Sequence, residues 1–235
     1  GAVLEQGGLR LTLQGDEAAM AIEGADGARW LTSAGPPRWG RARLDRLDLP
    51  HREGDALPPG VDGVLLRQAW TLDPRDRLWG FGQRTGGLDR RGRIWQLRTT
   101  DPFDAGLGGY PADADPLYQA IGFLVGLRST TAYGLLTDNT PRASFDLAAS
   151  EPTLVHITVD AGRMVQYLLA GPGLPAVLER YTRLTGRPDL PPRWVLGYHQ
   201  SRWGYTPADR VRQVAAELRD RAIPADAMWL DIQHM

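Results

Sequence analysis

The chain has 235 residues and a formal net charge of −1, because 27 basic residues, all arginine, face 28 acidic ones. This balance excludes a strong overall field for nucleic acid or an anionic membrane, and we expect neither partner. The absence of cysteine excludes a disulfide framework, a thiolate zinc site and a cysteine nucleophile. Nowhere do about 18 uncharged apolar residues follow one another, as a membrane-spanning helix requires. We therefore expect a cytoplasmic protein, although the glycine at position 1 leaves open a processed terminus and hence secretion.

From residue 9 to about residue 158 the sequence predicts an antiparallel β-sandwich, and therefore a mainly β fold class. Short alternating or apolar runs are separated there by glycine, proline and aspartate. The two-residue period is plain at Leu9, Leu11 and Leu13. No helix of ordinary length competes in this region. Further predicted strands are 19–22, 64–72, 93–97, 121–127, 133–137 and 153–159.

One long interruption of the predicted sandwich, residues 101–116, contains four aspartates, three glycines and three prolines. It cannot be a strand and is too long for a tight turn, so it is either functional or disordered. The aspartates Asp101, Asp104, Asp113 and Asp115 together suggest a calcium site, but their spacing lacks the alternating pattern of a calcium loop. A solvated loop is the preferred interpretation, and no metal site is predicted.

After residue 173 the apolar period changes to that of a helix, with Val177, Leu178, Tyr181 and Leu184 on one face. Gly186 and the following proline predict its end. The segment 188–192 contains three prolines and is typical of a stiff connector between domains.

Beyond the connector the pattern predicts strand, helix, strand. The apolar run 194–198 has strand length, and Thr206 and Pro207 predict a helix with an N-cap threonine and a proline at its first position. A second apolar strand follows at 227–230. Such a βαβ unit implies parallel strands, but an eight-fold barrel needs roughly 200 residues or more. The predicted stripe of the helix is Val211, Val214, Ala215, Leu218 and Ala222.

We therefore expect three parts: a sandwich domain at 1–170, a helix and connector at 171–192, and an incomplete β/α barrel segment at 193–235. Asp231 directly follows the second strand. In β/α barrels the carboxyl ends of the strands carry the functional groups, so this carboxylate is a candidate for binding sugar hydroxyls. The alternative is that Asp231 caps the next loop or pairs with an arginine such as Arg202.

Two stretches of the barrel segment, RWVLGYHQSRWGY at 193–205 and WLDI at 229–232, resemble the opening of the catalytic barrel of glycoside hydrolase family 31. Upstream, WGFGQRTG at 79–86 and RTTD at 98–101 resemble short elements of that family's N-terminal sandwich. The resemblance covers about residues 65–235. It implies a galactose-mutarotase-like sandwich followed by a TIM barrel, and an α-glucosidase-like retaining hydrolase that removes terminal α-linked sugars without a cofactor.

The resemblance also assigns roles to four residues of the chain. Asp231 resembles the family's aspartate that binds hydroxyls of the cleaved sugar, and Ile232 resembles the apolar neighbour that lines the same pocket. Trp203 resembles the aromatic wall of that pocket. Asp101 resembles the aspartate that the sandwich lends to the active site on a long loop. The alternatives are that Trp203 is a core residue and that Asp101 merely starts a turn.

Retaining hydrolysis needs two carboxyl groups, a nucleophile and an acid/base. The resemblance places both on later barrel strands, beyond Met235, so no catalytic residue is expected in this chain. We expect a fragment that binds an oligosaccharide or small α-glucoside, is inactive alone, and self-associates through an exposed barrel edge. The alternative is a free-standing carbohydrate-binding or interaction module that uses the sandwich and its tryptophans.

Overall fold

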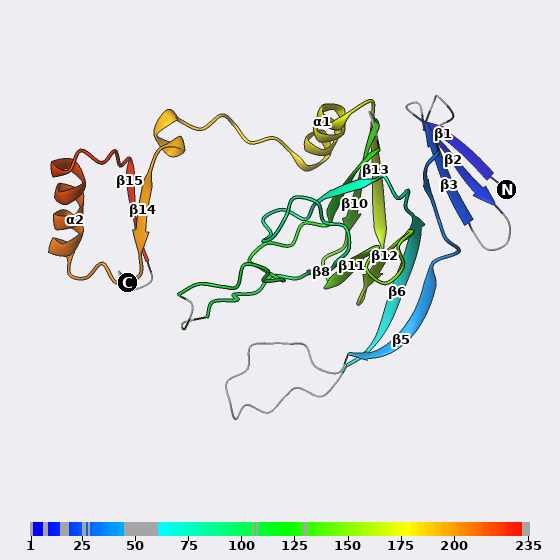
Figure 1. The fold of residues 1–235 in the computed structure, drawn as a ribbon, viewed down its shortest axis with the longest axis horizontal. Helices are drawn as coiled ribbons and strands as arrows, with labels where there is room; N and C mark the ends of the chain where they lie inside the picture. The colour runs from blue at the N-terminus through cyan, green and yellow to red at the C-terminus, as the bar shows by residue number, and fades with distance from the viewer. Residues whose placement is uncertain are drawn as a thin grey trace. The chain divides into compact units, whose positions relative to one another are not determined.

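The computed structural model describes residues 2–6, 9–14, 19–24, 27, 29–44, 61–104, 106, 108–128 and 131–231. The chain divides into two compact units, Gly1–Thr185 and Gly186–Met235 (Figure 1). Among the described residues, no helix combines the length and the apolar character that crossing a membrane requires.

In the residues that the structure describes, the first unit contains three antiparallel sheets. The N-terminal sheet runs in the order β1-β2-β3-β4, the five-stranded sheet in the order β5-β6-β12-β11-β8, and the helix-covered sheet in the order β13-β10-β9-β7. The long pair β5 and β6 is easily followed in Figure 1. The strands are β1 (Ala2–Gln6), β2 (Leu9–Gln14), β3 (Ala19–Gly24), β4 (Arg29–Thr32), β5 (Arg38–Leu44), β6 (Val61–Thr71), β7 (Arg77–Gly80), β8 (Ile94–Leu97), β9 (Phe123–Arg128), β10 (Thr131–Asp138), β11 (Ala143–Leu147), β12 (Leu154–Val159) and β13 (Val165–Gly171).

The core lies between the five-stranded and the helix-covered sheets. Trp95, Phe145 and Ile157 of the first pack with Leu78 and Leu135 of the second, and all five are 2% exposed or less. Apolar residues of β3 and β4 join the same cluster, which attaches the N-terminal sheet. This confirms the predicted antiparallel sandwich, because alternate residues of facing strands bury one side of each sheet.

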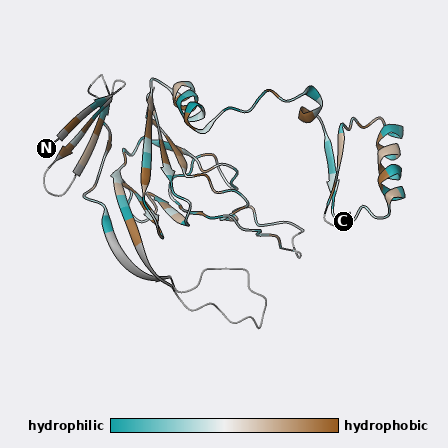
Figure 2. Ribbon diagram, turned by 180° about the vertical axis from the view of Figure 1, so that it is seen from behind, coloured by the Kyte–Doolittle hydropathy of each residue, from teal (hydrophilic) through white to brown (hydrophobic). Residues whose placement is uncertain are grey.

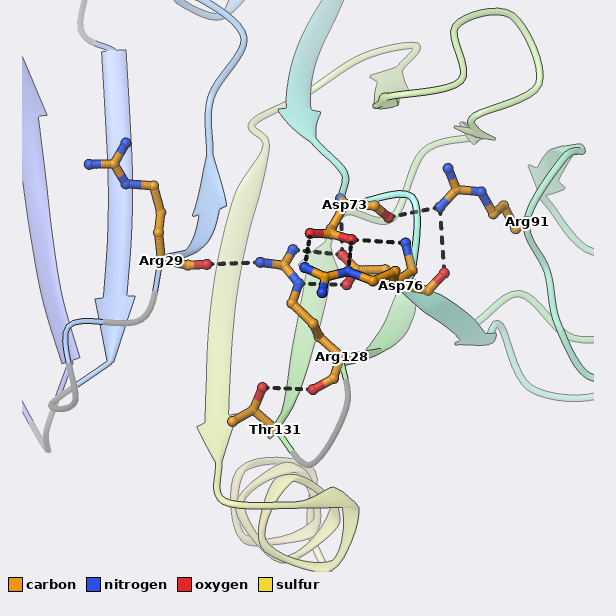
Figure 3. A network of polar contacts seen from close by, with 7 residues as sticks. Arg29, Asp73, Asp76, Arg91, Arg128 and Thr131 are labelled. Atoms are coloured by element: carbon orange, nitrogen blue, oxygen red, sulfur yellow. Dashed lines mark hydrogen bonds and ion pairs between the residues drawn. The ribbon is translucent and has the colours of Figure 1, made fainter.

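A partly buried charge network also links the sheets (Figure 3). Arg128, at the end of β9, donates from Nε and Nη2 to the two carboxylate oxygens of Asp76 at 2.6 and 2.8 Å. Its third nitrogen, Nη1, donates to the backbone carbonyl of Arg29 in β4 at 3.0 Å. One guanidinium thus joins the turn before β7, the helix-covered sheet and the N-terminal sheet.

Helix α1 (Leu174–Thr185) covers the helix-covered sheet against β10 and β13. Val177 is fully buried, and the ring of Tyr181 stacks on Phe123 with centroids 3.9 Å apart. The predicted stripe is wrong at Leu178 and Leu184, which stay more than two-fifths exposed because the sheet meets only part of the helix surface. Gly186 has a φ of +99°, which suits the predicted helix end.

The second unit contains a parallel strand pair joined by a helix, as predicted. Strand β14 (His199–Arg202) pairs in parallel with β15 (Ala227–Leu230), and α2 (Ala208–Asp220) connects them. The helix turns Val211, Val214, Ala215 and Leu218 to its half-buried side, and its polar residues alternate with apolar ones in Figure 2. Ala222 is exposed and lies beyond the helix end.

Two local predictions for this unit are wrong. Residues 194–198 do not form the first strand. Instead, Arg193–Leu196 form a 3-10 helix, in which the amide of Val195 bonds to the carbonyl of Pro192, and the strand begins at His199, where pairing with Ala227 becomes available. Thr206 does not cap the helix either, because Pro207 occupies the N-cap position without a side-chain hydrogen bond.

Candidate functional site

The long loop after β8, residues 101–116, is attached to the sandwich at its carboxyl end. Arg84 Nη1 bonds to Asp115 Oδ1 at 2.9 Å, and the two side chains are 0% and 6% exposed. The other oxygen of Asp115 accepts from the backbone amide of Gln96 at 2.7 Å. Burial lowers the pKa of Arg84, and the nearby Asp115 carboxylate opposes that shift. Asp115 therefore serves as a buried anchor for the loop.

Further bonds hold the two ends of the loop side by side. The amide of Thr100 donates to the carbonyl of buried Leu117 at 3.0 Å, and the hydroxyl of Thr85 donates to the carbonyl of Ala114 at 2.9 Å. The loop thereby projects from a defined base.

Asp101 lies at this base and is exposed. Its Oδ1 accepts the hydroxyl hydrogen of Tyr118 at 2.7 Å and the amide of Phe103 at 3.2 Å. The hydrogen bond to Asp101 is the main cause that raises the pKa of the Tyr118 phenol, since it favours the protonated form. The hydrogen bond from the Phe103 amide is the turn contact that the alternative interpretation of Asp101 predicts. The hydrogen bond from the Tyr118 hydroxyl is an additional contact, and it orients the carboxylate.

Three exposed aromatic side chains belong to this loop or follow it directly. Phe103, Tyr110 and Tyr118 are 58%, 37% and 47% exposed, and the two tyrosine rings meet edge to face with centroids 6.2 Å apart. We call Asp101 and these three residues the loop cluster. Aromatic faces beside a directed polar group are typical of sites that bind small ligands with both apolar and hydroxyl surfaces.

In the second unit, Trp203 and Asp231 follow the paired ends of β14 and β15. Arg202 pairs with Leu230, so the next residue of each strand lies at the same edge of the sheet. Both side chains are exposed, Trp203 by 67%, which disagrees with a core role within this unit. Ile232 lies outside the described residues.

His199, on β14, is held between two tryptophans. Its ring stacks on Trp194 at a centroid distance of 5.9 Å, and Nδ1 accepts from Trp229 Nε1 at 3.0 Å. Since Nδ1 is an acceptor, the proton belongs on Nε2, which lies 3.2 Å from the carbonyl of Trp194. These contacts join the 3-10 helix, β14 and β15.

Sequence reasoning missed the partners of the predicted residues. Tyr118 lies 17 residues from Asp101, and Trp229 lies 30 residues from His199. The only available signal was the gathering of aromatic residues at both ends of the aspartate-rich loop. Of its four aspartates, Asp115 is committed to Arg84, and among the described residues no group of three or more histidine or acidic side chains could hold a metal ion.

Comparison with known proteins matches residues 3–146 to the glycosyl hydrolase 31 N-terminal galactose mutarotase-like domain and residues 188–235 to the glycosyl hydrolases family 31 TIM-barrel domain. The chain is 38% identical over 164 residues to alpha-glucosidase 2 of Bacillus thermoamyloliquefaciens, a match that covers 70% of this chain and 20% of that protein. It is 29% identical over 169 residues to an alpha-xylosidase of Saccharolobus solfataricus, covering 71% and 21%.

Among solved structures, a mutant GH31 dextranase of Flavobacterium johnsoniae, complexed with isomaltotriose, superposes with a TM-score of 0.75 at 26% identity. That superposition covers 98% of this chain and 26% of the dextranase. The chain thus spans between a fifth and about a quarter of the length of these relatives.

Proposed function

The chain belongs to glycoside hydrolase family 31, and from this premise we propose that it supplies sugar-binding residues of an α-glucosidase-like retaining hydrolase. The substrate class is an oligosaccharide or small α-glucoside that loses a terminal sugar. The names of the relatives and the isomaltotriose in the dextranase structure support a sugar as the ligand.

The observation that carries the proposal is the loop cluster. The second oxygen of Asp101 accepts no hydrogen bond from the residues that the structure describes, while Tyr118 holds the first one in place. A carboxylate oriented in this way accepts a hydroxyl hydrogen from a sugar, and the exposed rings pack against its C–H faces.

In the second unit we propose the roles that the family resemblance implies. The Asp231 carboxylate binds hydroxyls of the sugar to be cleaved, Trp203 forms an aromatic wall, and Ile232 lines the same pocket. The common edge of Trp203 and Asp231 supports this assignment, because strand ends at the carboxyl edge of a β/α barrel carry its binding groups.

Retaining hydrolysis uses two carboxyl groups about 5–5.5 Å apart, one as nucleophile and the other as acid and then base. We assign neither role to a carboxylate of these 235 residues. The residues named above bind and orient the sugar, which lowers the entropy to be lost on reaching the transition state.

The proposal is tested with the purified 235-residue chain. We expect no release of nitrophenol from a nitrophenyl α-glucoside, but calorimetric binding of isomaltotriose that Asp101→Ala abolishes. Asp113→Ala removes an exposed aspartate from the same loop and is the matched control, with unchanged affinity expected. Turnover that Asp231→Ala abolishes would contradict the assignment of roles, and equal affinities of both loop variants would remove the loop cluster from the site.

A free-standing sugar-binding module is the second candidate, because the loop cluster lies entirely in the first unit. Asp231→Ala separates the two. Weakened isomaltotriose binding supports the hydrolase, whereas unchanged binding in Asp231→Ala together with lost binding in Asp101→Ala supports the module.

We also propose that the β14–β15 sheet mediates self-association. Leu196, Trp229 and Leu230 are 74%, 55% and 48% exposed, and a short sheet with open edges offers unpaired backbone groups. Sedimentation should reveal a mass that rises with concentration and falls again in Leu230→Glu. A strictly monomeric wild-type chain would exclude this association.

A further inference from the structure

A cavity of about 280 Å³ opens on the solvent face of the five-stranded sheet, on the side opposite the sandwich core. Its polar lining comprises Arg38 of β5, Arg67 of β6, His156 of β12, and Glu151, which precedes β12. Alternation along the strands explains why these residues share a face, since Leu66, Gln68 and Trp70 of β6 are buried on the other side. The remaining walls are Ala34, Pro36, Ala69 and Leu154.

Two like charges stand directly opposite each other in this cavity. Arg38 and Arg67 are partners in the antiparallel register of β5 and β6, an arrangement in which side chains lie about 5 Å apart at their Cβ atoms and equal charges repel. Neither guanidinium has a carboxylate or hydrogen-bond partner among the residues that the structure describes. Other arginines of this chain do have such partners, for example Asp73 for Arg75 and Asp89 for Arg77.

His156 adds an unfilled polar position beside the arginines. The residue is 7% exposed, and its Nε2 lies 2.9 Å from Glu151 Oε1. Its Nδ1 is buried and has no hydrogen-bond partner in the described structure. The Glu151 carboxylate only accepts, so Nε2 carries the hydrogen and Nδ1 is the acceptor of the ring. A buried acceptor without a donor is unfavourable, and a ligand hydroxyl in the cavity would relieve that state.

We propose that Arg38 and Arg67 bind the phosphate group of a phosphate monoester with a small organic body, and that a hydroxyl of that body donates to Nδ1 of His156. Guanidinium groups match phosphate oxygens in pairs, and an anion between the two arginines converts their repulsion into attraction. The apolar walls and the volume of the cavity suit the organic part of such an ester. This site is separate from the loop cluster and does not depend on the proposed hydrolase function.

Glu151 provides a sharp internal test, because its carboxylate is the acidic group lining the cavity and it competes with an incoming anion. The side chain is 56% exposed, so Glu151→Gln should fold normally. If the cavity binds phosphate, this change should tighten phosphate binding several-fold. If the two arginines are merely solvated, neither the wild type nor the variant should bind phosphate.

The experiment is calorimetric titration of the full chain with glucose 6-phosphate, inorganic phosphate and glucose at matched low ionic strength. We expect glucose 6-phosphate to bind, glucose to bind at least tenfold more weakly at this site, and Arg38→Gln or Arg67→Gln to weaken the phosphate-dependent binding at least tenfold. Arg183→Gln, an exposed arginine of α1, is the matched control and should retain wild-type affinity.

Inorganic phosphate distinguishes the two sources of the anion: equal affinity supports a free-phosphate site, and weaker affinity supports the ester. Thermal unfolding of each variant verifies folding, and phosphate should raise the midpoint of the wild-type chain but not of the Arg38→Gln/Arg67→Gln double variant. The proposal is overturned if sodium chloride at the same ionic strength produces the same shift, or if the double variant responds to phosphate as the wild type does.

Discussion

Gly80 is the residue at which β7 turns away from β9, and only glycine suits this position. Its φ is +130°, and a Cβ built there would lie 2.2 Å from the carbonyl oxygen of Phe123. Both the backbone conformation and the contact with main-chain atoms exclude a side chain. We predict that Gly80→Ala lowers the free energy of unfolding by more than about 2 kcal/mol, as measured by urea denaturation.

Gly92→Ala is the control for that prediction. Gly92 also has a positive φ, +82°, but nothing lies within 4 Å of the position that a Cβ would take, so only conformational strain remains, about 1 kcal/mol. A loss for Gly80→Ala no larger than that for Gly92→Ala would show that the main chain relaxes around the added carbon.

Tyr118 is the residue that we expect to position Asp101. Tyr118→Phe keeps the exposed ring and removes only the hydroxyl that donates to Asp101 Oδ1. Isomaltotriose affinity should fall roughly fivefold, because the carboxylate then samples orientations that do not bind the sugar. Tyr110→Phe, in the neighbouring ring, should leave the calorimetric affinity unchanged, and an equal fall in both variants would point to loss of general surface contact instead.

At the scale of elements, Arg128 joins β9, β4 and the turn before β7. Its partner Asp76 has a side chain with no exposed surface, whereas Arg128 itself is 28% exposed. Arg128→Met retains the apolar stem but leaves a buried carboxylate without its guanidinium, which should lower the free energy of unfolding by about 3–5 kcal/mol.

The matched control is Arg75→Met, since Arg75 pairs with Asp73 in the same turn but is 79% exposed. Chemical denaturation should find a loss for this variant that is much smaller than the loss for Arg128→Met, because solvent screens an exposed pair. Similar losses of free energy of unfolding in both variants would mean that burial does not strengthen the Arg128–Asp76 pair of Figure 3.

Elements with strong periodicity could be predicted from sequence, and weakly patterned ones could not. The predicted strands at 64–72 and 153–159 correspond closely to β6 and β12, because long alternating apolar runs have few other solutions. Strands β1, β4, β5, β7, β11 and β13 were missed, since most of them are short or are interrupted by glycine, arginine or aspartate. The run at 194–198 was mistaken for a strand, because apolar character alone does not reveal where a pairing partner exists.

At the scale of the molecule, the family and the positions of Asp101, Trp203 and Asp231 could be read from motifs and strand ends. Their side-chain partners could not. The bond from Tyr118 to Asp101 and the bond from Trp229 to His199 depend on contacts between distant parts of the chain, and no local pattern encodes such contacts. The domain limits and the binding roles of these residues stay predictions that the sugar-binding experiments address.

The pH dependence of stability is the prediction that concerns the first unit as a whole. The Arg75 side chain and amide lower the pKa of Asp73. Burial alone would raise the pKa of Asp89, but hydrogen bonds from the Arg91 amide and the Arg77 side chain outweigh burial and lower it. Burial opposes the lowered pKa of Asp146 in the same way, and hydrogen bonds from Ser150 and the Ala149 amide outweigh it. All three carboxyl groups therefore have folded pKa values below the ordinary value of 3.8.

Because the unfolded chain takes up protons first as the solution is acidified, these groups stabilise the folded state above their unfolded pKa, and that contribution is lost as pH falls through the folded values. Urea denaturation should therefore give a plateau in the free energy of unfolding near pH 6 and a steady fall below about pH 4. Asp146→Asn keeps one oxygen to accept the turn amides but cannot ionise, so its profile should be less steep than the wild-type profile. A free energy of unfolding that stays constant or rises between about pH 5 and pH 3 would contradict the lowered pKa values.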